Sequence, residues 1–530
     1  MTASIEGDAA GEVTSLAGRR VTVMGLGMFG GGLGAARWAL GEGARVTVTD
    51  RKERCELEDA VATLEAVDAP HPVRWTLGRH EAEDFDRADV VIVNPAVPPT
   101  SPWIERARAA GAEVTTATAL LLERCPARVV AVTGTQGKSS TSSFLRDLLE
   151  GSGDGPGRCL LGGNIGGSLL DELADLTPDD VLVLELSSYQ LEHLPDRVRG
   201  VIDVAAITNV GVDHLERHGT VEAYRDAKLR MLDLVRPGGA AVVPAGELAD
   251  RARARLGSHP TARVVTHGPG GEVDLAGTEV VRRGPGGPRT LADASQLQVP
   301  GRFQRLNLAV ALAAAAELGA DAGRLGACVP ELRGLGHRME SLGWVPVDAG
   351  EVHVIDNGVS TTPESTLAAV ESVEQDGPAI LVAGGQVKRG VDLDRLARRL
   401  AGPGEWVLVP FGAAADDLTR AAVAAGVQVA GPGVEADGVA AAAGTAEEAT
   451  ARALELAGRT GARTLLFSPA CASFDRYANF EARARAFRRV LPLPGSPRPL
   501  RRAGAAAGPP AEGDAPSHAP GPAPRPGGRT

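Results

Sequence analysis

The fold is decided by the stretch Val130-Ala131-Val132-Thr133-Gly134-Thr135-Gln136-Gly137-Lys138-Ser139-Ser140-Thr141. It predicts an apolar strand, a Gly-Lys-Ser turn and a helix that begins near Ser142. In such a turn the backbone N–H groups converge on phosphate oxygens, Lys138 neutralises the terminal phosphates and the Ser139 hydroxyl can bind Mg²⁺. Val132 stands where the usual P-loop pattern has its first glycine. We therefore expect an ATP or GTP site, with an ordinary strand-turn-helix connection as the alternative.

The composition excludes several classes of protein. The chain has 530 residues and 43% hydrophobic content, which predicts about three domains. Its net charge of -12 argues against a nucleic-acid partner. The five cysteines show no Cys-x-x-Cys spacing, which favours reduced thiols and a cytoplasmic location. No targeting segment or membrane-spanning run is expected.

A second glycine-rich motif lies near the N-terminus. Gly25-Leu26-Gly27-Met28-Phe29-Gly30 follows a predicted strand over 20–24 and precedes a helix through Trp38 and a strand over 45–49 that ends at Asp50. This G-x-G-x-x-G pattern with a later acid is typical of a site for a dinucleotide or a nucleotide diphosphate. A dehydrogenase is therefore an alternative function.

Polar residues follow two later apolar strands. The strand over 180–185 ends in Glu185, a candidate Mg²⁺ ligand, and the strand over 205–209 leads into a loop that holds Asp213, His214 and His218. Open α/β sheets place ligands at such strand ends. Lys228 lies in a predicted helix, where by itself it reads as a solvated charge.

The rest of the chain continues the α/β pattern. Residues 268–291 predict a hairpin or insertion loop, and the helix that ends near Leu318 carries Gln304 and Asn307 on one face. A third unit has apolar strands over 352–355, 379–383, 406–410 and 464–467. The fold class is therefore α/β with three domains: a Rossmann-like N-terminal domain, a P-loop-type central domain with a mostly parallel sheet, and a Rossmann-like C-terminal domain. The expected boundaries are 1–17 for a disordered N-terminus, 18–126, 127–334 and 335–491 for the three domains, and 492–530 for a disordered tail rich in Pro, Gly and Ala.

Taken together, the motifs resemble the Mur ligase family from about Val21 to Leu491. The most specific pieces are Gly162-Gly-Asn164-Ile-Gly166, Leu184-Glu185-Leu-Ser-Ser-Tyr-Gln-Leu-Glu192, Asp213-His214-Leu-Glu-Arg-His218, Ala227-Lys228-Leu-Arg230, His337-Arg338-Met-Glu340 and Ser468-Pro-Ala-Cys-Ala-Ser473-Phe-Asp475. The resemblance is to the members that add D-glutamate. It implies ATP-driven amide formation through an acyl phosphate in peptidoglycan synthesis, with UDP-N-acetylmuramoyl-L-alanine and glutamate as substrates. A monomer is expected.

The resemblance also implies a role for particular residues. The catalytic residues would be Lys138, Glu185, His214 and Lys228. Two Mg²⁺ ions would be held by Ser139, Glu185, His214 and a carbamylated Lys228, whose added oxygens suit a hard cation. ATP would contact Gly134, Thr135, Gln136, Gly137, Lys138, Ser139, Ser140, Asn307 and Arg338. The UDP-linked substrate would contact Gly27, Met28, Phe29, Gly30, Asp50, Asn164, Ser187 and Gln190. Glutamate would contact Thr361, Lys388, Ser473 and Phe480.

Several positions depart from the family pattern. Gln136 replaces an asparagine, Phe303-Gln304 replaces His-Asn, and Gln386-Val387 replaces Asp-Gly. The segment from Asp356 to Thr361 stands where the family commonly has Asp-Ser-Lys-Ala-Thr. An alignment on Thr361 puts Asn357 at the aspartate and Val359 at the lysine, whereas a shift of one residue would restore Asp356. A paralogue that adds L-glutamate or another amino acid is therefore an alternative, as is a nucleotide-binding protein without ligase activity.

Overall fold

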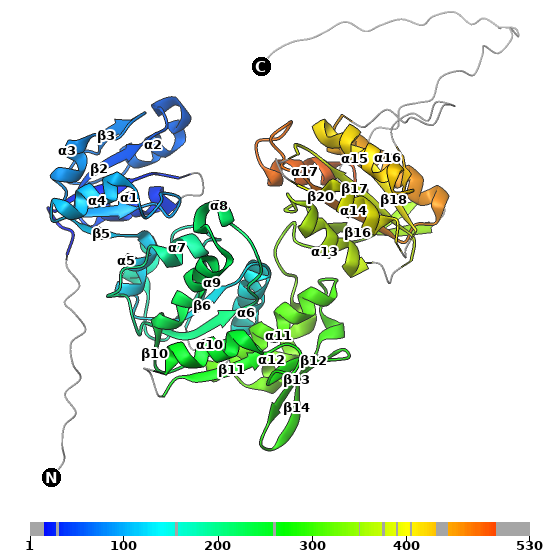
Figure 1. Ribbon diagram of the computed structural model, residues 1–530, viewed down its shortest axis with the longest axis horizontal. Coiled ribbons are helices and arrows are strands. Elements are labelled where there is room, and N and C mark those ends of the chain that lie inside the picture. Colours follow the sequence, from blue (N-terminus) through cyan, green and yellow to red (C-terminus); the bar gives the residue numbers. More distant parts are fainter. Residues whose placement is uncertain are drawn as a thin grey trace, which may run out of the picture.

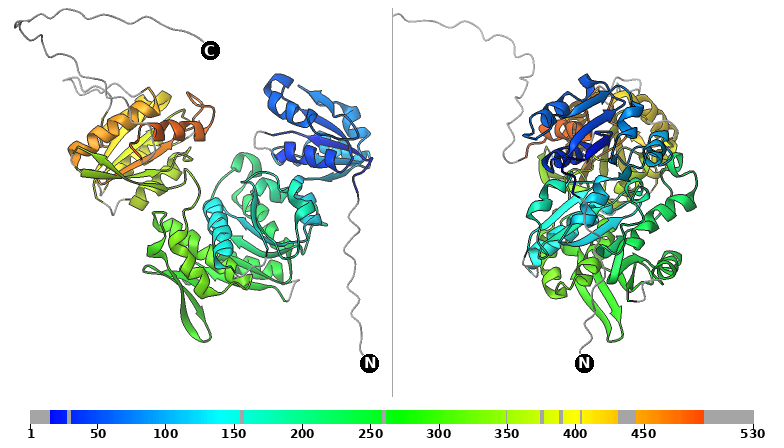
Figure 2. Two further views of the ribbon diagram at one scale, coloured as in Figure 1. Left: turned by 180° about the vertical axis from the view of Figure 1, so that it is seen from behind. Right: turned by 90° about the vertical axis from the view of Figure 1, so that its left-hand side faces the viewer.

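The computed structural model describes residues 15–27, 31–153, 157–257, 261–348, 350–373, 377–387, 391–402, 405–430 and 444–493. It contains three β-sheets in three successive domains, so the predicted α/β class is confirmed. The N-terminal and C-terminal domains stand on either side of the central one (Figures 1 and 2). No helix in this part of the chain is long and apolar enough to cross a bilayer.

The N-terminal domain is a parallel five-stranded sheet with strand order β3-β2-β1-β4-β5. Apolar strands without alternation are expected where helices cover both faces of a parallel sheet. The strands are β1 (Arg20–Met24), β2 (Arg45–Asp50), β3 (Arg74–Leu77), β4 (Val90–Val93) and β5 (Glu113–Thr115). The helices are α1 (Gly31–Gly41), α2 (Glu58–Glu65), α3 (Ala82–Asp86), α4 (Pro102–Ala109) and α5 (Ala117–Arg124). Leu16, which we expected in a disordered segment, is buried in this domain's core because it packs among apolar side chains.

The central domain has a nine-stranded sheet with order β14-β13-β12-β11-β10-β9-β6-β8-β7. The strands are β6 (Arg128–Thr133), β7 (Cys159–Gly163), β8 (Val181–Glu185), β9 (Ile202–Ile207), β10 (Val235–Pro244), β11 (Arg263–His267), β12 (Val273–Ala276), β13 (Glu279–Gly284) and β14 (Gly287–Asp293). The helices are α6 (Lys138–Ser152), α7 (Ser188–Glu192), α8 (Leu215–His218), α9 (Val221–Leu229), α10 (Glu247–Leu256), α11 (Arg302–Glu317) and α12 (Ala322–Cys328). The strands from β7 to β12 are parallel, and β13 and β14 form the expected hairpin.

The C-terminal domain has a six-stranded sheet with order β15-β16-β20-β17-β18-β19. The strands are β15 (Glu340–Val347), β16 (Gly350–Asp356), β17 (Ala379–Gly384), β18 (Trp406–Phe411), β19 (Gln428–Val429) and β20 (Thr464–Ala470). The helices are α13 (Pro363–Val373), α14 (Leu393–Leu400), α15 (Ala415–Ala424), α16 (Ala446–Thr460) and α17 (Phe480–Arg489). The antiparallel edge strand β15 was not predicted, because its sequence contains Gly, Pro and Trp rather than a continuous apolar run.

Candidate active site

The phosphate loop joins β6 to α6. The helix begins at Lys138 and not near Ser142, because Gly137 turns the chain in the left-handed region at φ 80° and serves as its N-cap. A Cβ atom on Gly137 would lie 2.2 Å from Asn307 Oδ1 of α11. The loop therefore needs glycine both for its backbone angle and for its close contact with α11.

The Lys138 side chain folds back over this loop. Its Nζ donates to the carbonyls of Gly134 and Thr135, each at 2.9 Å. Burial lowers the pKa of Lys138, an effect that nearby Glu185 opposes and Arg338 reinforces. An ammonium held only by backbone carbonyls is available to an anionic ligand.

Glu185 stands at the carboxyl end of β8 and is 1% exposed. Its Oε1 accepts a hydrogen bond from Asn164 Nδ2 at 2.7 Å, whereas its buried Oε2 has no hydrogen-bond partner among the described residues. A buried carboxylate oxygen without a partner carries a large desolvation cost unless a cation neutralises it. The residues therefore fit a Mg²⁺ ligand at Glu185, because Mg²⁺ binds carboxylate oxygens.

Lys228 of α9 is buried beside the same loop, at 2% exposure. Its Nζ donates to the Gly134 carbonyl at 2.7 Å and lies 4.7 Å from the centre of the Tyr224 ring. Burial, reinforced by Lys138, lowers the pKa of Lys228 to about 7. The expectation from residue type alone, a solvated surface charge, is wrong, because the side chain points into the protein.

His214 pairs with acidic residues of its own loop in its present rotamer. It is the N-cap of α8 with φ 51°, and its imidazole is paired with Asp213 at 3.5 Å and Glu216 at 3.4 Å. Tyr189 OH is 3.4 Å from its Nδ1. Its side chain is 44% exposed, so it has room to change rotamer toward a metal.

A cleft of about 350 Å³ lies between the central and C-terminal domains. Its walls contain residues 135–140, Asn307, Arg338 and Thr361, which were predicted, and also Asn209 and Asn357, which were not. Asn307 donates to Gln304 at 3.0 Å, which confirms the predicted common face of α11. Among the described residues no side-chain hydrogen bond or ion pair engages Arg338, and burial lowers its pKa.

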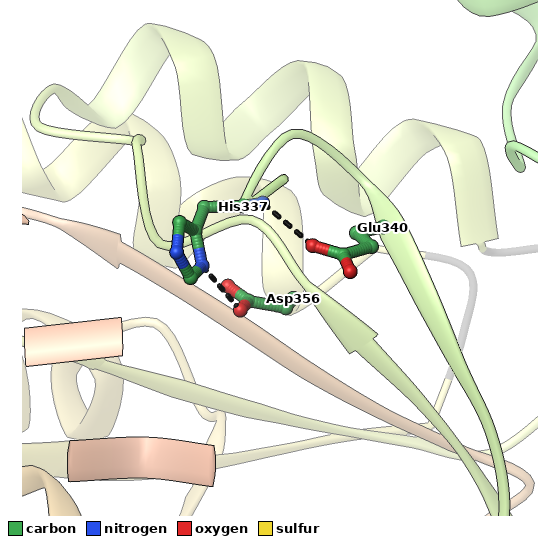
Figure 3. Close-up of side chains that lie close together, drawn as sticks. All are labelled: His337, Glu340 and Asp356. Atoms are coloured by element: carbon green, nitrogen blue, oxygen red, sulfur yellow. Dashed lines mark hydrogen bonds and ion pairs between the residues drawn. The ribbon is translucent and has the colours of Figure 1, made fainter. Parts of the chain in front are cut away.

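The segment that leads into the C-terminal domain is fixed by a cluster of charges around Asp356. His337 Nδ1 lies 2.7 Å from Asp356 Oδ2, and the His337 amide donates to Glu340 Oε2 at 2.8 Å (Figure 3). Arg488 of α17 donates to Asp356 at 2.6 Å and forms an ion pair with Glu340. The three residues of Figure 3 are close enough to bind a metal. The Arg488 guanidinium, however, already neutralises the carboxylates of Asp356 and Glu340, so the cluster does not need a metal ion.

This cluster distinguishes Asp356 from Asn357. Asp356 is fully buried and faces His337, whereas Asn357 lines the cleft and accepts from the Met339 amide at 3.3 Å. His337 and Met339 both have positive φ angles, 62° and 54°, and they flank Arg338. Asn357, and not Asp356, therefore reaches the cleft. This agrees with the alignment on Thr361, which puts Asn357 in the aspartate position.

A smaller cleft of about 80 Å³ lies between the N-terminal and central domains. Gly25, Asn94 and Pro95 line it on one side, and Ser168 and Gln190 on the other. Ser187 and Gln190 form a capping box at the start of α7.

Of the predicted contacts of the UDP-linked substrate, Gln190 lines this cleft, whereas Gly27, Asp50, Asn164 and Ser187 are not among its lining residues. Asp50 Oδ2 accepts from the Leu26 amide at 2.9 Å and so supports the glycine turn that includes Gly27. Asn164 contacts Glu185 rather than this cleft. Met28, Phe29 and Gly30 lie outside the described residues.

The predicted glutamate contacts come from several loops. Thr361 lines the larger cleft, Ser473 is buried after β20, and Phe480 begins α17 with its ring 6.3 Å from that of His337. Lys388 lies outside the described residues. The wholly buried Arg483 joins three neighbouring loops, because it donates to the carbonyls of Gly358, Gly384 and Cys471.

Comparisons with known proteins agree with this geometry. Residues 132–315 match the Mur ligase middle domain, and residues 19–116 match the MurD-like N-terminal domain of Mur ligases. The UDP-N-acetylmuramoylalanine--D-glutamate ligase of Roseiflexus sp. is 35% identical, over 90% of this chain and 99% of the relative. The enzyme of the same name from Desulfitobacterium hafniense (strain DSM 10664 / DCB-2) is 31% identical, over 89% and 97%.

Solved structures share the fold at lower identity. MurC, the UDP-N-acetylmuramate-alanine ligase of Thermotoga maritima, is 19% identical with a TM-score of 0.54, over 88% of this chain and 98% of that one. MurF of Acinetobacter baumannii is 18% identical with a TM-score of 0.52, over 86% and 88%.

Proposed function

The chain belongs to the Mur ligase family and is an ATP-dependent, amide-forming ligase of peptidoglycan synthesis, and we propose that it joins D-glutamate to UDP-N-acetylmuramoyl-L-alanine. The observation that carries the proposal is the buried Glu185 carboxylate, one oxygen of which has no hydrogen-bond partner among the described residues, in the domain that also holds the phosphate loop, Lys138 and the buried Lys228. A dehydrogenase would have no use for such a group.

Each domain then has one task. Residues 18–126 hold the UDP of the substrate, residues 127–334 hold ATP, and residues 335–491 hold glutamate. The glycine turn and Asp50 support the first assignment, since backbone N–H groups at a helix start suit a diphosphate. The proposed ATP contacts that line the larger cleft come from two domains of one chain, which supports a monomer, and the scattered cysteines suit the reducing cytoplasm.

In the first step a carboxylate oxygen of the L-alanyl group attacks the γ-phosphorus of ATP. A new O–P bond forms, the bond to the β-phosphate oxygen breaks, and ADP leaves. Both reactants are anionic, so positive charge must offset the growing repulsion. Lys138 and Arg338, which lie in the same cleft, supply that charge, and the amides at the start of α6 hold the phosphates.

Magnesium would be held by Ser139, Glu185, His214 and Lys228, and when bound it neutralises phosphate and substrate oxygens. Lys228 becomes an oxygen donor by reaction with CO₂: its neutral amine forms an N–C bond, one C=O bond opens to a carboxylate, and a proton is released. The pKa of about 7 supports this modification, because a large fraction of the amine is neutral near pH 7.

In the second step the amine of glutamate attacks the acyl phosphate. The C–N bond forms, inorganic phosphate leaves, and the nitrogen loses a proton. Thr361, Lys388, Ser473 and Phe480 would hold the glutamate in this step. Arg483 keeps the loops after β16, β17 and β20 in fixed relation, which supports a single binding site there.

A second candidate, an enzyme that adds L-glutamate or another amino acid, is favoured by one observation. Val359 lines the larger cleft at the position where the family pattern has a lysine. Because valine is uncharged, a carboxylate of the incoming amino acid would lack the positive charge that the lysine supplies in the family pattern.

Phosphate release from ATP tests both candidates. Purified enzyme receives UDP-N-acetylmuramoyl-L-alanine and Mg²⁺, with D-glutamate in one tube and L-glutamate in the other. Release with D-glutamate alone is expected. Release with L-glutamate alone would select the second candidate, and release with neither would refute both glutamate assignments.

A further inference from the structure

Arg217 of α8 bridges the N-terminal and central domains beside a further cleft, of about 640 Å³, which it lines together with Glu192 and His218. Its guanidinium is buried to 10% exposure and donates to the carbonyls of Pro95, Ala96 and Val97 at 3.2, 3.1 and 2.9 Å. These carbonyls belong to the loop after β4, in the N-terminal domain. Pro95 and the preceding Asn94 line the smaller cleft, so Arg217 grips the outer side of a cleft wall.

The same guanidinium is anchored to the central domain. Its Nε donates to Glu192 Oε1 at 2.7 Å, and its centre lies 4.7 Å from the middle of the Tyr189 ring. His193 Nε2 adds a second link, at 2.7 Å from the Val97 oxygen. Charge-assisted hydrogen bonds to several fixed acceptors hold a planar guanidinium more rigidly than one bond would.

Arg217 is also tied to His214 through one turn of helix. The amides of Arg217 and His218 both donate to the His214 carbonyl at 3.0 Å. His214 has a left-handed backbone, and its imidazole pairs with Asp213 and Glu216. A displacement of α8 therefore displaces the backbone that carries the imidazole.

We propose that Arg217 is a positioning residue that couples nucleotide-substrate binding in the smaller cleft to the placement of His214 beside Glu185. The inference rests on the proposed function. When the substrate orders the loop of residues 95–97, Arg217 transmits that order to α8, and the metal site is completed only after the substrate is present. Coupling between two sites is reciprocal, so Mg²⁺ must raise the affinity for the substrate by the same factor.

A second arginine provides a matched control. Arg197 also bridges the first two domains, with Glu113 and Glu123 each at 2.8 Å. Within the described part of the chain, its side-chain hydrogen bonds and ion pairs reach β5 and α5 rather than the loop after β4 or α8. Loss of Arg197 weakens the attachment of the domains without interrupting the proposed connection.

The test measures binding and not turnover. Affinity for UDP-N-acetylmuramoyl-L-alanine is measured by calorimetry with and without Mg²⁺, and hydrogen exchange is followed in residues 211–219. In the wild type we expect Mg²⁺ to strengthen binding about fivefold or more, and substrate to slow exchange in that segment. Arg217→Gln should abolish both effects, Arg217→Lys should retain part of each, and Arg197→Gln should retain both.

Three outcomes would overturn the inference. One is an unchanged Mg²⁺ effect in a folded Arg217→Gln protein, and another is the same loss in Arg197→Gln. If Arg217→Gln does not fold, a full effect in Arg217→Lys, which cannot reach all three carbonyls at once, overturns it as well. Failure of the wild type to bind the substrate at all would instead refute the proposed function, and the inference with it.

Discussion

Lys138 and Lys228 donate to the same acceptor, the carbonyl oxygen of Gly134, at 2.9 and 2.7 Å. Two ammonium groups that share one buried oxygen repel each other, and the charge of Lys138 adds to burial in lowering the pKa of Lys228. Lys228 is the more buried of the two side chains and has its pKa lowered to about 7. In the proposed mechanism Lys138, on the phosphate loop, contacts phosphate, and Lys228 is the amine that would react with CO₂.

Lys228→Ala should reduce phosphate release on the order of a hundredfold or more, because an oxygen donor to the metal is lost. Acetate or formate should restore part of the activity, since a small carboxylate can occupy the place of the carbamate. Methylammonium should restore none. Rescue by methylammonium instead of acetate would show that Lys228 acts as a cation and would contradict the carbamate.

Gly137→Ala should weaken ATP binding about tenfold or more, because the new Cβ would lie 2.2 Å from Asn307 Oδ1 in a backbone with φ 80°. Gly153→Ala is the matched control: Gly153 has φ 63° at the other end of α6, and no described heavy atom lies within 4 Å of the place that its new methyl group would take. Calorimetry with a non-hydrolysable ATP analogue measures the difference. If both variants lost the same affinity for the analogue, backbone strain alone would explain the effect, and the contact with Asn307 would not matter.

Arg488→Gln should raise the KM for ATP and lower the free energy of unfolding by about 1–3 kcal/mol, because buried Asp356 loses a charged donor. The KM rises because the cluster holds the segment that carries Arg338. Arg489→Gln, which removes a neighbouring side chain that is 70% exposed, should change neither quantity. Lower stability with an unchanged KM would mean that the cluster holds the domain together but does not position Arg338.

Asp89→Asn should lower the Tm of the protein at pH 7. Hydrogen bonds from the Arg20 side chain and amide lower the pKa of Asp89 from near 3.8 to about 2. A carboxylate whose pKa is lower in the folded state stabilises the fold above pH 4, and that contribution is lost as the pH falls toward 2. The difference in Tm between wild type and variant should therefore narrow below pH 4. A constant difference down to the lowest pH at which the wild type folds would contradict this assignment, and Asp68→Asn, at another position of the same domain, is the control.

Local sequence predicted most of the parallel strands and the polar residues at their ends. The strand before Gly25, the strand that ends at Glu185 and the common face of Gln304 and Asn307 all follow from apolar runs and helical spacing. Such features depend on neighbours within a few residues, so a short segment of sequence is enough to predict them. The prediction that α6 begins near Ser142 was wrong, because the helix begins at Lys138. The sequence alone does not show whether Gly137 ends the loop or lies inside a longer one.

Features that depend on distant pairs were not predictable in this way. The burial of Lys228 depends on the Gly134 carbonyl, 94 residues earlier in the chain. The choice between Asp356 and Asn357 depends on Arg488, 132 residues beyond Asp356. Arg217 carries no sequence signal beyond its motif, since its acceptors are backbone carbonyls, which every residue has.

The buried Arg483 has a consequence for inhibitor chemistry. Its guanidinium fastens the loops after three strands of the C-terminal sheet to one point, so these loops travel as a single rigid block. A compound that binds these three loops would therefore meet the same surface however the C-terminal domain is oriented. Resistance by a small shift of one loop would then require all three loops to shift together.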